Sequence, residues 1–292
     1  MSAWVLRLRA YGSLVRFSHT VFALPFAASA VLLALARPHA ALTPARAAAM
    51  LVAMVTARTA AMAWNRWLDR DVDARNPRTA SREIPAGVVS SRAALALTLA
   101  SSAAFVGAAA TLGPWPARLA LPVLAVLLGY SATKRFTWAS HLVLGLALAL
   151  APGGAWLAMG VAPEPGIVAL MVAVLTWVAG FDVLYSLQDE AFDRAEGLHS
   201  IPARFGTLGA VALSGALHLV TVAALVACGA WLGRGAPFWA AVAVVAGLLA
   251  YEHAIVGRGD LARIDKAFFD INGWVSGAFF ALVAVDAWRL AS

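Results

Sequence analysis

Long apolar runs constrain this chain more than any other feature of its sequence. A bilayer core about 30 Å thick requires roughly 17 to 25 apolar residues of a spanning helix. Nine runs of about this length follow one another, in a chain whose mean hydropathy is +0.80: 17–36, 43–65, 92–112, 116–133, 138–160, 166–188, 206–232, 236–256 and 268–288. They lack the short alternating pattern of membrane β-barrel strands. The sequence therefore predicts an all-α, polytopic membrane protein of about nine transmembrane helices.

The distribution of basic residues predicts the orientation of these spans. Cytoplasmic loops of membrane proteins collect Lys and Arg. With the N-terminus placed in the cytoplasm, inside segments hold sixteen such residues and outside segments five. This bias predicts a cytoplasmic N-terminus in a bacterial inner membrane. The net charge of +7 fits anionic lipid headgroups, and no basic tail or motif indicates nucleic-acid binding.

Acidic residues gather at the cytoplasmic ends of two spans. Nine of the fifteen lie in two clusters: Asp69, Asp71, Asp73 and Glu83, and Asp182, Asp189, Glu190, Asp193 and Glu196. Placing "LDRDVD" beside "QDEAFD" aligns Asp69 with Asp189 and Asp73 with Asp193. This similarity fits either an internal repeat of four-helix units or a chance match. We treat residues 1–292 as one domain in both cases.

Helical spacing predicts which of these side chains act together. Residues at i, i+4, i+7 and i+11 share one face of an α-helix, which groups Arg58, Asn65, Asp69 and Asp73 on one helix, and Asp182, Asp189 and Asp193 on another. Solvated helix ends are the simpler interpretation. However, carboxylates at a helix C-terminus cost about 0.3–1 kcal/mol each. An ionisable group as deep as Asp182 costs at least about 2.5 kcal/mol, so we expect a functional site.

The residue types indicate a hard cation and a phosphate. Carboxylates without Cys or His at ligand spacing favour Mg²⁺, which takes one or two protein carboxylates together with substrate phosphate oxygens. Basic residues beside the acids would hold a diphosphate: Arg66, Arg78, Arg82, Lys134 and Arg135. The apolar bundle would then hold an isoprenoid tail. Departure of the diphosphate would leave an allylic cation for attack by an electron-rich acceptor, with Tyr185 among the aromatic side chains able to shelter it.

These motifs resemble those of the UbiA superfamily of intramembrane prenyltransferases. "NRWLDRDVD" and "YSLQDEAFDR" have the two family forms, and further similarity lies in "NPRTASREIPAG", "TKRFTWASH" and "GLHSIPARFG". The resemblance implies nine helices around a central cavity and Mg²⁺-dependent transfer of a prenyl chain to an aromatic acceptor. By the same resemblance, Asn65, Asp69 and Asp73 form the first metal–diphosphate motif, and Asp189 and Asp193 the second.

Other site residues also follow from the resemblance. Asp182 matches a carboxylate that orients the acceptor or takes its proton, and Lys134 matches a lysine near the diphosphate. Arg58 is our candidate anchor for an acceptor carboxylate, with a structural pairing to Asp182 as the alternative. His19 has a matching place in the family but equally suits a core histidine, and we interpret His141 and His218 as packing residues.

The sequence leaves several candidates for the acceptor molecule. Many family members have Asp directly after the motif Asn, where this chain has Arg66. That departure resembles a branch associated with menaquinone made by the futalosine route, so the aromatic acid is either 4-hydroxybenzoate or a dihydroxynaphthoate. Haem, chlorophyllide or a glycerol lipid are other acceptors on this scaffold. A cation-coupled secondary transporter is the alternative from another class, although it would need acids nearer the midplane.

Overall fold

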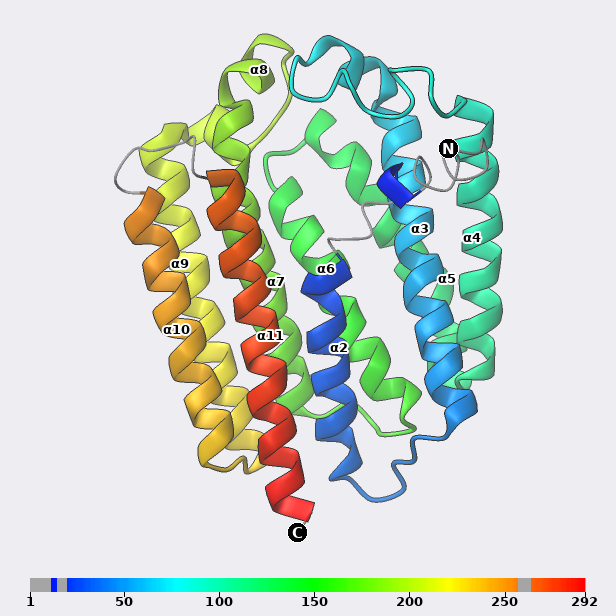
Figure 1. Ribbon diagram of the computed structural model, residues 1–292, viewed down its shortest axis with the longest axis vertical. Coiled ribbons are helices and arrows are strands. Elements are labelled where there is room, and N and C mark those ends of the chain that lie inside the picture. Colours follow the sequence, from blue (N-terminus) through cyan, green and yellow to red (C-terminus); the bar gives the residue numbers. More distant parts are fainter. Residues whose placement is uncertain (1–11, 15–19, 257–263, 292) are drawn as a thin grey trace, which may run out of the picture. The chain divides into compact units, whose positions relative to one another are not determined.

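The computed structural model describes residues 12–14, 20–256 and 264–291. Helices make up the secondary structure of these residues, which contain no strand (Figure 1). The chain divides into two compact units. The first contains residues 43–132 with the described part of the first twenty, and the second contains 21–42 and 133–292.

Three long helices build the first unit: α3 (Pro44–Arg75), α4 (Ser91–Thr111) and α5 (Pro114–Gly129). Thr43 and Ser90 precede α3 and α4, and each side chain accepts a hydrogen bond from a backbone N–H in the first turn. α4 packs against both α3 and α5. Their shared core contains Phe105, Ala109, Ala120 and Leu124.

The second unit is assembled around α7. Its helices are α2 (Thr20–Leu35), α6 (Ser140–Ala158), α7 (Pro165–Tyr185), α8 (Glu190–Ala195), α9 (Ile201–Leu232), α10 (Ala236–Val256) and α11 (Ile264–Ala291). α7 packs against α6, α9 and α11. Trp177 on α7 is fully buried, with its ring centroid 5.0 Å from that of Phe26 on α2. α7 is therefore surrounded by its own unit.

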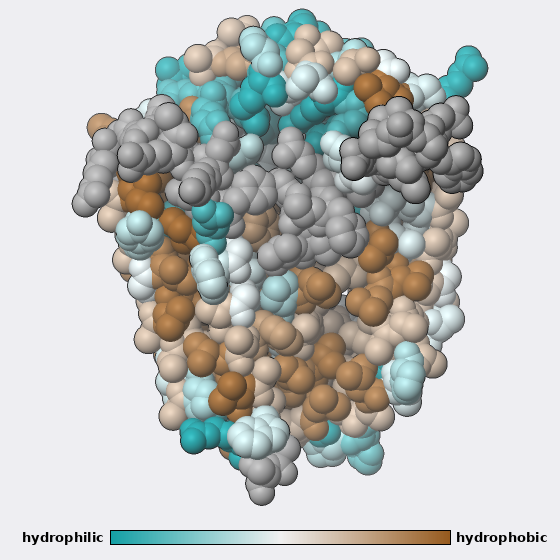
Figure 2. All heavy atoms as spheres, viewed as in Figure 1, coloured by the Kyte–Doolittle hydropathy of each residue, from teal (hydrophilic) through white to brown (hydrophobic). Residues whose placement is uncertain are grey.

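Within the described residues, eight helices are long and apolar enough to cross a membrane, and α2 is a shorter apolar helix. Hydrophobic side chains occupy much of the surface seen along the helices in Figure 2. Leu208, Leu219 and Trp288 are more than two-thirds exposed, as lipid-facing residues are. The chain is an integral membrane protein, and the predicted all-α class is confirmed. The first of the nine predicted spans, 17–36, begins in residues that the structure does not describe.

Two helices depart from regular α geometry near the second acidic cluster. α7 ends at Tyr185 and continues as a 3₁₀ segment, η3 (Ser186–Asp189), before α8. Gly206 interrupts α9 with φ 71° and ψ 175°, a conformation that glycine adopts without steric cost. The predicted start of this span, residue 206, therefore coincides with the break rather than with the first residue of the helix.

Gly145 permits the close packing of α6 on α7. A Cβ at this position would lie 2.2 Å from the carbonyl oxygen of Leu175. We expect Gly145→Ala to reduce the free energy of unfolding by about 1–3 kcal/mol, because backbone must move to relieve the overlap. Unfolding of the purified protein in detergent would measure this. Gly154→Ala on the same helix is the matched control, because its Cβ would enter open space. Equal effects would contradict the packing argument.

Candidate functional site

The first motif lies on the last turns of α3. Asn65, Asp69 and Asp73 lie on one continuous helix, as the spacing predicts, and the helix runs to Arg75, ten residues beyond the predicted end of the span. Asn65 Nδ2 donates to Asp69 Oδ2 at 2.8 Å. Both side chains are half-buried, whereas Asp73 is buried. Asp71 points elsewhere, with 74% of its side chain exposed.

The segment after α3 folds back onto this motif. Arg82 Nη1 lies 2.6 Å from Asp73 Oδ1, and Thr79 Oγ1 donates to the Asp73 carbonyl. Arg66 is only 3% exposed, and its Nη1 donates to Asn65 Oδ1 at 3.3 Å. Two of the predicted diphosphate-binding arginines thus contact motif residues directly. Arg78 is exposed, and its backbone N–H donates to Asn76 Oδ1.

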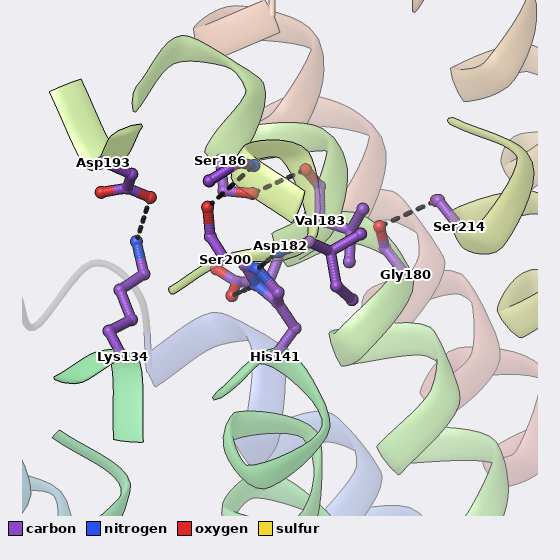
Figure 3. A network of polar contacts seen from close by, with 11 residues as sticks. Lys134, His141, Gly180, Asp182, Val183, Ser186, Asp193, Ser200 and Ser214 are labelled. Carbon is purple, nitrogen blue, oxygen red and sulfur yellow. Dashed lines mark hydrogen bonds and ion pairs between the residues drawn. The ribbon is translucent and has the colours of Figure 1, made fainter. Parts of the chain in front are cut away.

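The second motif spans η3 and α8. Asp189 ends η3 and Asp193 lies within α8, and both are buried. Lys134 Nζ lies 3.3 Å from Asp193 Oδ2, as Figure 3 shows. The Lys134 carbonyl also accepts a hydrogen bond from the His199 backbone N–H, which ties the lysine to the loop before α9. Arg135, the next residue, is exposed.

Asp182 occupies a separate position on α7, one turn before the helix ends. Its Oδ2 lies 2.6 Å from Nδ1 of His141, a fully buried residue at the start of α6 (Figure 3). The sequence interpretation of His141 as a packing residue therefore missed its partner. An ionisable group at membrane depth requires a polar partner. The depth of Asp182 in its span was therefore the one sequence feature that indicated a polar partner. It does not indicate which residue is that partner.

The residues proposed to bind the acceptor come from several segments of the chain. Arg58 lies on α3, two turns before Asn65, and is half-buried, and Tyr185 is half-buried at the end of α7. His141 pairs with Asp182, and both roles considered for Arg58 stay predictions. His19 lies outside the described residues.

The donor chemistry of both motifs fits a hard divalent cation. Among the residues that the structure describes, no three His, Cys, Asp or Glu side chains are grouped closely enough to hold a metal by themselves. Mg²⁺ does not need such a group, because it completes its coordination with water and substrate phosphate. Each motif offers carboxylates accompanied by a basic side chain, Arg82 in one and Lys134 in the other. These pairs suit a metal that arrives with an anionic substrate.

The membrane helices and the two Asp-rich motifs fit the class of intramembrane enzymes that bind a metal and a phosphate. The family model described as "UbiA prenyltransferase family" matches residues 23–288. The chain belongs to this family, and it is a prenyltransferase.

Relatives and solved structures agree with this assignment. A 4-hydroxybenzoate octaprenyltransferase from Azoarcus sp. is 31% identical over 80% of this chain and 81% of its own length. The enzyme of that name from Vibrio cholerae is 29% identical over 79% of this chain and 81% of its own length. The apo structure of a UbiA homologue from Aeropyrum pernix K1 is 36% identical, with a TM-score of 0.83, and covers 92% of this chain and 98% of its own. A homologue from Archaeoglobus fulgidus bound to GPP and Mg²⁺ shares the fold at 21% identity, with a TM-score of 0.72. The match covers 94% of this chain and 99% of the homologue.

Proposed function

We propose that this protein transfers a polyprenyl group from a polyprenyl diphosphate to an aromatic hydroxy acid, in a Mg²⁺-dependent step of quinone biosynthesis. The observation that carries the proposal is that each Asp motif contains a buried carboxylate held by a basic side chain, Asp73 by Arg82 and Asp193 by Lys134. The names of the relatives support 4-hydroxybenzoate as the acceptor. The Mg²⁺ and prenyl diphosphate bound to the Archaeoglobus homologue support the donor and the metal.

Both motifs serve one magnesium diphosphate in this proposal, and the whole chain is one catalytic domain. Bound Mg²⁺ would neutralise the charge that develops on the leaving diphosphate. Arg66, Arg82 and Lys134 bind phosphate oxygens in this proposal, and the exposed side chains of Arg78 and Arg135 are further candidates for the same role. Arg82 and Lys134 each lie beside a motif carboxylate, and both side chains would be able to bind phosphate oxygens if these carboxylates held Mg²⁺.

The acceptor is bound by residues on α3 and α7 in this proposal. Arg58 pairs with its carboxylate, Asp182 orients the ring hydroxyl or takes the proton released on substitution, and Tyr185 shelters the allylic cation. The protein acts in the bacterial inner membrane with this site open to the cytoplasm, which the distribution of Lys and Arg supports.

Product analysis tests the proposal. Purified protein is incubated with Mg²⁺, prenyl diphosphates of several lengths, and either 4-hydroxybenzoate or a dihydroxynaphthoate, and the products are identified by mass spectrometry. We expect a prenylated 4-hydroxybenzoate and no product when EDTA replaces Mg²⁺. A prenylated naphthoate alone would assign the chain to the menaquinone branch, which the Arg66 departure also fits. Absence of product from both acids would overturn the proposed function.

Arg58 provides a prediction about acceptor choice. Loss of a charge-assisted hydrogen bond costs about 1.5–3 kcal/mol, so Arg58→Gln should raise the KM for 4-hydroxybenzoate by roughly 10- to 100-fold. The KM for an acceptor without the carboxylate, such as a substituted phenol, should change little. Steady-state kinetics with both acceptors measures the difference. Equal losses for the two acceptors would remove Arg58 from this role.

A further inference from the structure

His141 lies where three helices of the second unit meet. It is at the start of α6, and its Nδ1 contacts Asp182 on α7 (Figure 3). Its Nε2 accepts from the backbone N–H of Ile201, the first residue of α9. The side chain is fully buried. Burial at a junction between helices would also suit a packing residue, and the contacts of the two ring nitrogens distinguish the two roles.

The start of α9 determines which ring nitrogen carries the proton. The first N–H groups of a helix have no partner within the helix. Ser200 caps α9 by accepting from the Ala203 N–H, which leaves the Ile201 N–H to donate to His141 Nε2 at 3.4 Å. A backbone N–H is only a donor, so Nε2 accepts and is unprotonated. The proton of the ring is then on Nδ1, which donates to Asp182.

This hydrogen bond leaves one oxygen of Asp182 for a substrate. The Nδ1–Oδ2 distance of 2.6 Å is typical of a charge-assisted bond. Asp182 is about one-quarter exposed, and Oδ2 is occupied by the imidazole, so Oδ1 is the oxygen that remains to accept from another group. His141 cannot rotate without also breaking the contact with Ile201. The carboxylate is therefore held in one orientation by a ring that is itself fixed at both nitrogens.

We propose that His141 is a positioning residue for the aromatic acceptor: through its Nδ1–H it fixes Asp182 so that Oδ1 meets the acceptor hydroxyl. This inference rests on the proposed function, because it assigns Asp182 to the acceptor. Misplacement of a reacting or orienting group by about 1 Å can cost on the order of 100-fold. The effect should appear in kinetics that depend on the acceptor and not in the KM for the prenyl diphosphate.

Two substitutions of similar size separate this role from packing. The Asn amide nitrogen mimics Nδ1, whereas the longer Gln side chain places its amide near Nε2. We expect His141→Asn to retain kcat/KM for the acceptor within about 3-fold of the wild-type value, and His141→Gln to lose roughly 10- to 100-fold. In an Asp182→Asn background, the added His141→Gln change should cost little more. Equal effects of Asn and Gln, or a full additional loss in the Asp182→Asn background, would overturn the proposal.

A spectroscopic measurement gives an answer even if these variants do not fold. Nitrogen-15 NMR of the protein labelled at histidine reports which ring nitrogen is protonated, with the His141 signals assigned by elimination from proteins in which the other histidines are replaced one at a time. We expect a proton on Nδ1 and none on Nε2, and the reverse would contradict the inference. The measurement needs no substrate. If the wild-type protein had the expected tautomer but transferred no prenyl group, the result would contradict the proposed function and leave the His141–Asp182 geometry unaffected.

Discussion

Replacing Asp69 or Asp189 with alanine is expected to abolish Mg²⁺-dependent prenyl transfer, with a loss of about 10³-fold or more. Each residue is proposed to bring a metal ion to the departing diphosphate, and electrostatic stabilisation of developing charge is usually the largest catalytic term. The loss should appear in single-turnover assays with saturating donor and acceptor, because it affects ionisation of the allylic bond rather than substrate supply.

Asp71 supplies the matched control for this prediction. It lies two residues from Asp69 on α3, but 74% of its side chain is exposed, and its neighbour is Arg70 at 3.5 Å. Asp71→Ala should therefore retain most of the activity. All variants must elute from size-exclusion chromatography as the wild type does. Normal turnover by folded Asp69→Ala or Asp189→Ala protein would refute the assignment of that motif.

The second large effect concerns the fold and lies in a buried ion pair of the second unit. Arg234, just after the end of α9, lies 2.6–2.7 Å from Asp286 Oδ2 on α11, and the Gly235 N–H donates to Asp286 Oδ1. The two side chains are only 2% and 1% exposed. Removing one partner of such a pair leaves a buried charge uncompensated, at a cost of about 3–5 kcal/mol. We expect Asp286→Asn to lower the free energy of unfolding by this amount.

A double substitution distinguishes the cost of an orphaned charge from the loss of packing. Arg234→Met combined with Asp286→Leu removes both charges and keeps apolar volume, so it should recover much of the lost stability. Denaturant or thermal unfolding in the same detergent measures all three proteins. If Asp286→Asn unfolded like the wild type, the ion pair would have no role in joining the α9–α10 turn to α11.

Hydrophobic length predicted most of the helices because the membrane requires it directly. The run predicted at 236–256 is α10, Ala236–Val256, residue for residue. Apolar length locates the membrane-embedded part of a helix but not its polar extension. For this reason α3 continues to Arg75, well past the predicted boundary at 65, and carries the whole first motif.

The spacing rule worked for the first motif and was incomplete for the second. It assumes 3.6 residues per turn throughout, which holds along α3. Between Asp182 and Asp193 the chain passes through the four-residue 3₁₀ segment η3. A 3₁₀ helix has fewer residues per turn than an α-helix, so each residue rotates the chain by about 20° more. Over four residues, the following side chains are rotated by about 80° relative to a continuous α-helix. Asp182 and Asp193 accordingly contact different partners, His141 and Lys134.

The contact of His141 with Asp182 was beyond sequence reasoning for a different reason. The two residues are 41 positions apart on different helices, so no helical period relates them. The packing of α6 on α7, helped by the absence of a side chain at Gly145, brings them together. Patterns within one segment predict local structure, whereas this pair depends on tertiary packing.

Both Asp motifs are proposed to bind the same magnesium diphosphate. A crystal structure of the protein with Mn²⁺ in place of Mg²⁺ and a non-hydrolysable prenyl diphosphate analogue tests it most directly, because anomalous scattering locates the metal independently of the protein. We expect metal coordinated by carboxylates of Asp69 or Asp73 and of Asp189 or Asp193 around one diphosphate. Metal and diphosphate held by one motif alone, with the other turned toward lipid, would contradict it.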